Sequence, residues 1–160
     1  MAMRREPPRL GRGRQQGMAL LVSLVFLLLL TLIGVSSLRN ATLQEKMAAS
    51  LSLRNQSFQA AESALRAGEG AVQQGHYTLP ACARCPPPAE SSGVTAAGAN
   101  SHSGVTWVAT DQGFYGVQNL GATLDAVNLP PHTAATLYRV TAVGVAGHSR
   151  TVLESIYAKY

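Results

Sequence analysis

The chain has 160 residues, of which 13% are charged, with a net charge of +5 at pH 7. Five arginines and Glu6 precede residue 18, so residues 18–160 carry eight basic and seven acidic residues. This near-neutral body excludes a basic footprint for nucleic acid. The length suits one globular domain plus a separate segment, and two cysteines exclude a framework of several disulfides.

Residues 1–17 form a basic leader before an apolar segment. On the C-terminal side of that segment, Arg39 is the only basic residue close to it. The positive-inside rule therefore predicts that the N-terminus stays in the cytoplasm and that residue 39 onward lies outside it. A secretory signal has a shorter apolar region and a small-x-small cleavage site. An uncleaved signal anchor remains an alternative. The leader arginines are Arg4, Arg5, Arg9, Arg12 and Arg14.

Residues 18–38 contain neither a charged residue nor a proline. About 20 residues rising ~1.5 Å each cross a hydrocarbon core of roughly 30 Å, and a single segment in lipid must be helical. A chain of this length cannot easily bury such a segment on all sides. We therefore expect a transmembrane helix, whose few hydroxyls bond back to carbonyls one turn earlier. These hydroxyls belong to Ser23, Thr31, Ser36 and Ser37.

Residues 39–75 continue the helix, because helix formers dominate and neither proline nor glycine occurs between Arg39 and Ala67. We expect it to end at Gly75. Large and small apolar residues recur at helical spacing, which predicts a buried face made of Met47, Leu51, Phe58, Ala61 and Leu65. Small side chains would also let a sheet approach closely, at Ala60, Ala61, Ala64, Ala67 and Ala71.

Two motifs carry a family resemblance. The leader ends in Arg14-Gln15-Gln16-Gly17 directly before the apolar segment, and residues 58–65 read Phe-Gln-Ala-Ala-Glu-Ser-Ala-Leu. Over about residues 10–70 the chain resembles the PilX-type minor pilins of the type IV pilus. The resemblance implies that a prepilin peptidase cleaves after Gly17 and N-methylates Met18, while the helix is retained.

The family usually has glutamate at the fifth mature position, which here is Val22. That glutamate is thought to pair with the N-terminal amine of the preceding subunit. An unpaired carboxylate among apolar helices would be costly, so its absence points to the filament tip or to initiation.

The resemblance further implies an inner-membrane protein with a periplasmic head, later incorporated into the extracellular pilus to support adhesion and twitching motility. The implied partners are other minor pilins, the major pilin, the prepilin peptidase and inner-membrane lipid, with no cofactor. A pseudopilin of a type II secretion system and an uncleaved, signal-anchored periplasmic binding protein remain alternatives.

Residues 76–104 are rich in Pro, Gly, Ser and Ala, which predicts a loop. Cys82 and Cys85 lie in it, and outside the cytoplasm we expect them to form a local disulfide. Pro86-Pro87-Pro88 argues against a thioredoxin-like redox site. Zinc would need two more ligands, and no histidine is paired at ligand spacing, so we expect no metal site. The histidines are His76, His102, His132 and His148.

In the C-terminal part, the residue pattern predicts a strand at residues 104–109, with Trp107 as a core anchor. The pattern at residues 113–117 is a weaker indication of a second strand. A loop follows at 128–132, and strands at 137–145 and 150–158 form a hairpin. The inward face of the last strand stays open. We expect an α+β fold, with an antiparallel sheet of three or four strands laid on the outer half of the long helix.

No catalytic constellation is present, since Asp111 and Asp125 are isolated and neither a Gly-x-Ser-x-Gly turn nor a phosphate-binding glycine loop occurs. The sequence thus predicts a structural subunit, not an enzyme. Its expected organisation is a leader (1–17), a transmembrane and assembly helix (18–38), the continuation of that helix (39–75) and a periplasmic head (76–160).

Overall fold

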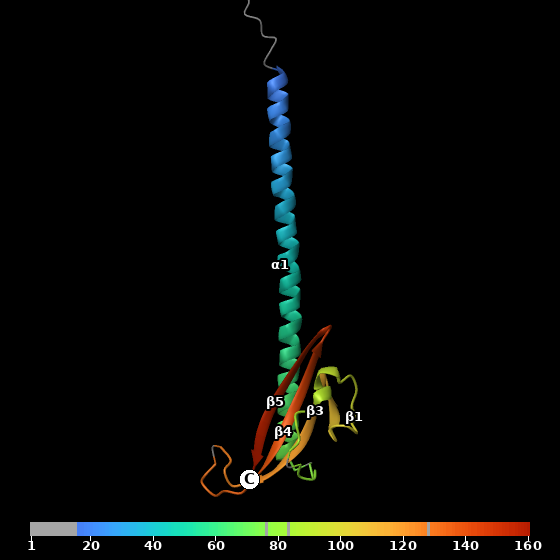
Figure 1. Ribbon diagram of the computed structural model, residues 1–160, viewed down its shortest axis with the longest axis vertical. Coiled ribbons are helices and arrows are strands. Elements are labelled where there is room, and N and C mark those ends of the chain that lie inside the picture. The colour runs from blue at the N-terminus through green and yellow to red at the C-terminus, as the bar shows by residue number, and fades with distance from the viewer. Residues whose placement is uncertain (1–15, 76, 83, 128) are drawn as a thin grey trace, which may run out of the picture. The chain divides into compact units, whose positions relative to one another are not determined.

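The computed structural model describes residues 16–75, 77–82, 84–127 and 129–160. The leader arginines and His76 lie outside the described residues. The chain divides into two compact units, Met1–Met47 and Ala48–Tyr160. One helix, α1 (Gln16–Gln73), supplies all the described residues of the first unit and continues into the second (Figure 1).

The helix α1 ends close to Gly75, as the sequence predicts. The helix ends at Gln73, and Gly75 has a φ of +80°, a left-handed conformation that glycine adopts without a steric penalty. The amide of Gly75 donates to the carbonyl of Val72 at 3.1 Å, and Lys159 Nζ donates to the same carbonyl at 3.1 Å. A cationic group thus contacts a terminal helix carbonyl, where the helix dipole favours positive charge.

The second unit contains a five-stranded antiparallel sheet in the order β1-β2-β3-β4-β5 (Figure 1). The α+β, pilin-like fold predicted from the sequence is confirmed. The predicted loop 76–104 contains a 3-10 helix, η1 (Ala89–Gly93), and the short strand that raises the predicted count to five. The strands are β1 (Gly98–Ala99), β2 (Thr106–Thr110), β3 (Gly113–Thr123), β4 (Ala135–Ala146) and β5 (Ser149–Lys159).

Small residues form the face of α1 that packs on the sheet. A Cβ atom at Gly144 in β4 would overlap the helix backbone at Ser57 and Ala61, and one at Gly68 would overlap the side chain of Val140. Backbone therefore lies directly against backbone, which requires small side chains on both sides. The buried positions of this face are Ser57, Ala60, Ala61, Ala64, Gly68 and Val72.

The predicted large apolar face of the helix is wrong at three positions. Met47, Leu51 and Phe58 are 66%, 59% and 45% exposed. Met47 and Leu51 lie in a stretch, residues 17–52, in which every side chain is exposed, so no face of the helix is buried there. At Phe58 the close helix–sheet approach leaves no room for a large side chain, and the small residues face the sheet instead. The prediction that small residues admit the sheet is confirmed at Ala60, Ala61 and Ala64, whereas Ala67 is exposed and Ala71 is half-buried.

The sheet has a core on each face. The core on the helix side joins Ala64 and Val72 of α1 to residues of β3 and β4 such as Tyr115 and Val140. The second core contains Val94, Val105, Trp107 and Val143. Trp107 is 3% exposed, which confirms it as a core anchor.

The structure settles the inward face of β5, which the sequence left open. Ser57 Oγ lies 3.1 Å from Ser149 Oγ and 2.8 Å from Thr151 Oγ1, and Ser155 Oγ donates to Glu69 Oε1 at 2.5 Å. The odd-numbered side chains of β5 therefore face the helix. The even-numbered ones face the other way, since successive residues of a strand alternate. The inward face mixes Ser149, Thr151 and Ser155 with Leu153 and Tyr157, which is why hydrophobic alternation did not reveal it.

Candidate functional site

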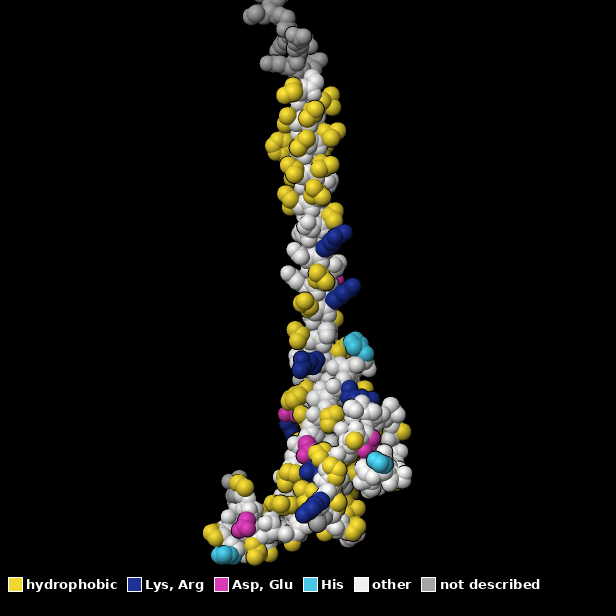
Figure 2. Space-filling model, viewed as in Figure 1, with side chains coloured by type: hydrophobic (Ala, Val, Ile, Leu, Met, Phe, Trp, Pro, Cys, Tyr) yellow, Lys and Arg dark blue, Asp and Glu magenta, His cyan; other side chains and the backbone are white. Residues whose placement is uncertain are grey.

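The first candidate site is the N-terminal part of α1. Every side chain from Met18 to Leu38 is exposed, and apolar side chains cover the side of this part of the helix that Figure 2 shows. By length and composition, α1 contains a segment able to cross a membrane. An apolar helix without a polar face is stable only in lipid or among other apolar helices.

The hydroxyls of this segment are satisfied within the helix at two of the four predicted positions. Ser23 Oγ donates to the carbonyl of Leu20 at 2.9 Å, and Thr31 Oγ1 donates to that of Leu28 at 2.8 Å. For Ser36 and Ser37 the described residues contain no such bond. Internal bonding at Ser23 and Thr31 lowers the cost of placing these hydroxyls in an apolar environment.

The predicted processing residues lie in the first two turns of α1. A Cβ at Gly17 would meet no atom within 4 Å, and Met18 and Val22 are 68% and 47% exposed. The structure thus brings Gly17, Met18 and Val22 to one end of the apolar segment. It does not test cleavage, methylation or the role of Val22, which stay predictions.

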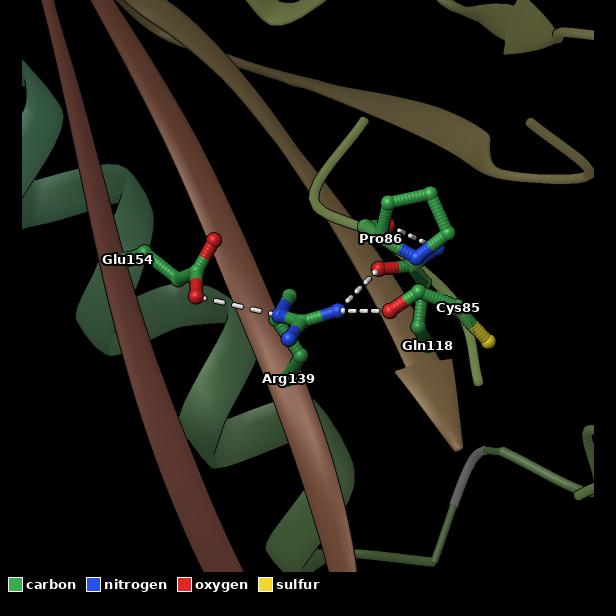
Figure 3. Close-up of polar contacts among 5 residues, drawn as sticks. All are labelled: Cys85, Pro86, Gln118, Arg139 and Glu154. Atoms are coloured by element: carbon green, nitrogen blue, oxygen red, sulfur yellow. Dashed lines mark hydrogen bonds and ion pairs between the residues drawn. The ribbon is translucent and has the colours of Figure 1, made fainter. Parts of the chain in front are cut away.

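The second candidate site is the cysteine loop, residues 82–86. The Cα atoms of Cys82 and Cys85 are 5.7 Å apart, a separation that a disulfide can span. Figure 3 shows Arg139 of β4 reaching this loop: its Nη1 donates to the carbonyl of Cys85 at 2.7 Å and to Gln118 Oε1 at 3.3 Å. Its Nε donates to Glu154 Oε1 of β5 at 3.0 Å.

Two residues of β3 extend this attachment. Gln118 Nε2 donates to the carbonyl of Pro86 at 3.3 Å, and Asn119 Nδ2 donates to that of Leu79 at 2.8 Å. The amide of Cys82 in turn donates to the carbonyl of Asn119 at 2.8 Å. The sequence analysis missed Arg139, Gln118 and Asn119. The available signal was weak: Gln118-Asn119 and the single Arg139 are polar residues within apolar strand sequences, where such side chains need hydrogen-bond partners.

Glu90 of η1 accepts hydrogen bonds from Ser103 Oγ and, at 3.3 Å, from Trp107 Nε1. Burial acts to raise the pKa of Glu90, but the bonds from Ser103, the backbone and Trp107 together hold that pKa below its ordinary value. The remaining titratable candidates are dispersed: His102, His132, His148, Asp111 and Asp125 are exposed. Within the described ranges, no three His, Cys, Asp or Glu side chains could share a metal ion.

Comparison with known families identifies the N-terminal region. A family model described as PilX N-terminal matches residues 16–66. The chain carries a PilX-type N-terminal region. The matched residues include the exposed apolar segment and most of the small-residue face of α1, and they support a PilX-type pilin. Neither curated proteins nor solved structures gave a match.

The PilX N-terminal region indicates a minor pilin of the type IV pilus, hence a structural subunit that assembles with other pilins. The exposed apolar helix fits a membrane-anchored pilin. The resemblance stated for residues 10–70 is therefore confirmed over residues 16–66. The PilX match does not extend over the sheet, so its function has to be argued from the structure alone.

Proposed function

We propose that this chain is a minor pilin that is cleaved after Gly17 by a prepilin peptidase and N-methylated at Met18. It is held in the inner membrane with its head in the periplasm, and then joins other minor pilins and the major pilin to prime the fibre. The observation that supports this proposal most directly is the PilX N-terminal match. It includes the apolar segment of α1, residues 18–38, in which every side chain is exposed. Such a helix exchanges lipid contacts for contacts with other helices on assembly.

Gly17→Val tests the processing step. The bulky side chain should block cleavage, leaving an unprocessed precursor and lowering piliation. Gly34→Val is a matched control, because both glycines lie in α1 and a Cβ at either meets no atom within 4 Å. The control variant should be processed normally on an immunoblot. Normal processing and piliation of the Gly17 variant would refute the assignment.

Val22 supports a position at the tip, since a subunit with none ahead of it has no N-terminal amine to pair. Val22→Glu should be tolerated or mildly harmful. A clear gain in the amount of this chain in sheared pili would contradict the tip position. From that position the subunit would support adhesion and twitching motility, which piliation and motility assays of a deletion strain measure.

Two other assignments are separated by direct observation. A type II secretion pseudopilin shares the helix and its processing, but would be needed for secretion and not for piliation. A signal-anchored binding protein would keep its leader and would never appear in a filament. Purified pili analysed for this polypeptide distinguish all three.

We also propose a disulfide between Cys82 and Cys85. The 5.7 Å separation of their Cα atoms and the expected periplasmic location support it. The bond would close a loop of four residues that Arg139 already holds through the carbonyl of Cys85.

A further inference from the structure

A cleft of about 500 Å³ lies next to the second core of the sheet. Its apolar lining includes Val94, which is buried in that core, and Phe114 and Val145, which are half-buried and pack against it. A volume of roughly 300–1,000 Å³ with a mainly apolar lining and a few polar groups is typical of sites for small molecules. The polar groups of the cleft therefore indicate the class of ligand that fits it.

Both walls of the cleft are attached to the sheet. On one side, Arg150 Nη1 of β5 donates to the carbonyl of Val94, which fixes the segment that follows η1. On the other side, the amide of Val145 in β4 donates to the carbonyl of Gln112 at 3.0 Å, which fixes the turn between β2 and β3. Because these bonds hold both walls in place, a ligand binds here without first ordering them.

Two oppositely charged side chains line the cleft, Arg150 from β5 and Asp111 from the β2–β3 turn. In the sheet, β4 separates β5 from the strands that this turn joins. Among the described residues, neither side chain forms an ion pair with the other or with a third residue. The cleft thus presents one positive and one negative group that this part of the chain leaves unpaired.

Arg139 and Arg150 differ in how their guanidinium groups are satisfied. Arg139 uses its Nε to bind Glu154 at 3.0 Å, which compensates its charge. Arg150 is also half-buried, but within the described ranges only its Nη1 has an acceptor, and that acceptor is an uncharged carbonyl. The remaining Nε and Nη2 are donors that can bind a carboxylate through two parallel hydrogen bonds. Arg150 therefore has both the charge and the donors for a carboxylate.

We propose that the cleft binds an apolar dipeptide with free termini, whose carboxylate binds Arg150 and whose ammonium group lies at Asp111. Its apolar side chains pack on Phe114 and Val145. An apolar anion would be repelled by Asp111 and an apolar cation by Arg150, whereas a ligand with both charges is attracted by both groups. Neighbouring strands lie ~4.8 Å apart, so charges on either side of β4 favour a dipeptide over a single amino acid, at ~3.5 Å per extended residue. This inference does not depend on cleavage at Gly17 or on entry into a filament.

Saturation-transfer NMR of the full chain in nanodiscs tests the ligand class, with empty nanodiscs as the background. The probes are dileucine, its C-terminal amide, which lacks the carboxylate, and its N-acetyl derivative, which lacks the ammonium group. We expect dileucine to bind and each single-charge analogue to bind about tenfold more weakly, because a hydrogen bond between charged groups contributes by that order. No binding of dileucine, or equal binding of either analogue, would overturn the proposal.

Two variants assign the ends of the ligand. In Arg150→Gln, dileucine and its amide should bind equally, and in Asp111→Asn, dileucine and its N-acetyl derivative should bind equally. Arg66→Gln and Asp125→Asn are matched controls, since both residues are exposed and neither lines the cleft, so both variants should keep the preferences of the parent protein. Trp107 fluorescence reports whether the second core stays intact.

Retained preferences in a folded Arg150→Gln or Asp111→Asn variant would overturn the proposal. The comparison of dileucine with its two analogues uses the parent protein alone. It therefore decides the proposal even if Arg150→Gln, which removes the bond to Val94, does not fold.

Discussion

Two stretches of the same helix use opposite means of making contact. Residues 18–38 carry large apolar side chains that are exposed on every side, whereas residues 57–72 present Ser57, alanines, Gly68 and Val72 to a sheet that covers them. Large side chains maximise apolar area for any neighbour, lipid or helix. Small side chains allow one partner to approach at backbone distance. The first stretch suits contacts that change on assembly, and the second suits a contact that is permanent.

The largest expected effect comes from adding a methyl group where backbones touch. Gly144→Ala would push a Cβ into the helix backbone at Ser57 and Ala61, so we expect a loss of about 3 kcal/mol in the free energy of unfolding. Gly70→Ala is the matched control, because a Cβ there meets no atom within 4 Å and alanine favours a helix by ~1 kcal/mol. Urea unfolding of the full chain in detergent, followed by Trp107 fluorescence, measures both. Equal effects would contradict the close packing.

Shortening one side chain to alanine in each stretch, at Val72 and at Leu28, compares the two stretches directly. Val72 is 1% exposed and Leu28 is 56% exposed. Val72→Ala should cost about 2 kcal/mol of head stability through lost burial and a cavity. Leu28→Ala should leave the same unfolding transition unchanged. A comparable loss from Leu28→Ala would mean that the apolar stretch supports the head.

Loss of the proposed disulfide in the cysteine loop should have a smaller effect on the free energy of unfolding. In the chain-entropy account, a disulfide closing four residues contributes at most about 2 kcal/mol, and Arg139 holds the loop without it. Cys82→Ser should therefore lower the free energy of unfolding by less than this amount. Treatment of the parent protein with a reductant should give the same loss. A larger loss from reductant than from the substitution would argue against a Cys82–Cys85 bond.

The smallest effect on stability under ordinary conditions is expected for a substitution at Tyr77. Burial, together with Tyr115, raises the pKa of Tyr77 well above its ordinary value of 10.0. Above pH 10 the unfolded chain loses the tyrosine proton and the folded chain keeps it, so stability is complete below pH 10 and falls as the pH rises. Tyr77→Phe should make this alkaline decline in melting temperature shallower. An identical decline in both proteins would contradict a raised pKa at Tyr77.

The sequence predicted those features that depend on neighbouring residues. The uninterrupted helix, its end near Gly75 and the β4–β5 hairpin follow from local composition and turn residues. The buried face of the helix was predicted in two incompatible ways, because periodicity favours Leu51 and Phe58 while close approach favours Ala60 and Ala64. Only the position of Gly144, far along the chain, decides between them.

The attachment of the cysteine loop could not be predicted for a similar reason. Arg139 is 54 residues from Cys85, and Gln118 is 32 residues from Pro86. Such contacts depend on which strands are neighbours, which local patterns do not encode. The proposed processing residues Gly17 and Met18, in contrast, could be named from the sequence because a leader and an apolar segment are adjacent in the chain.

Mass spectrometry of this polypeptide from sheared pili tests the account most directly. We predict a mature chain that begins at N-methylated Met18 and lacks residues 1–17. A chain that retains its arginine-rich leader, or one that is absent from the pili while present in the membrane, would contradict assembly through the processed helix.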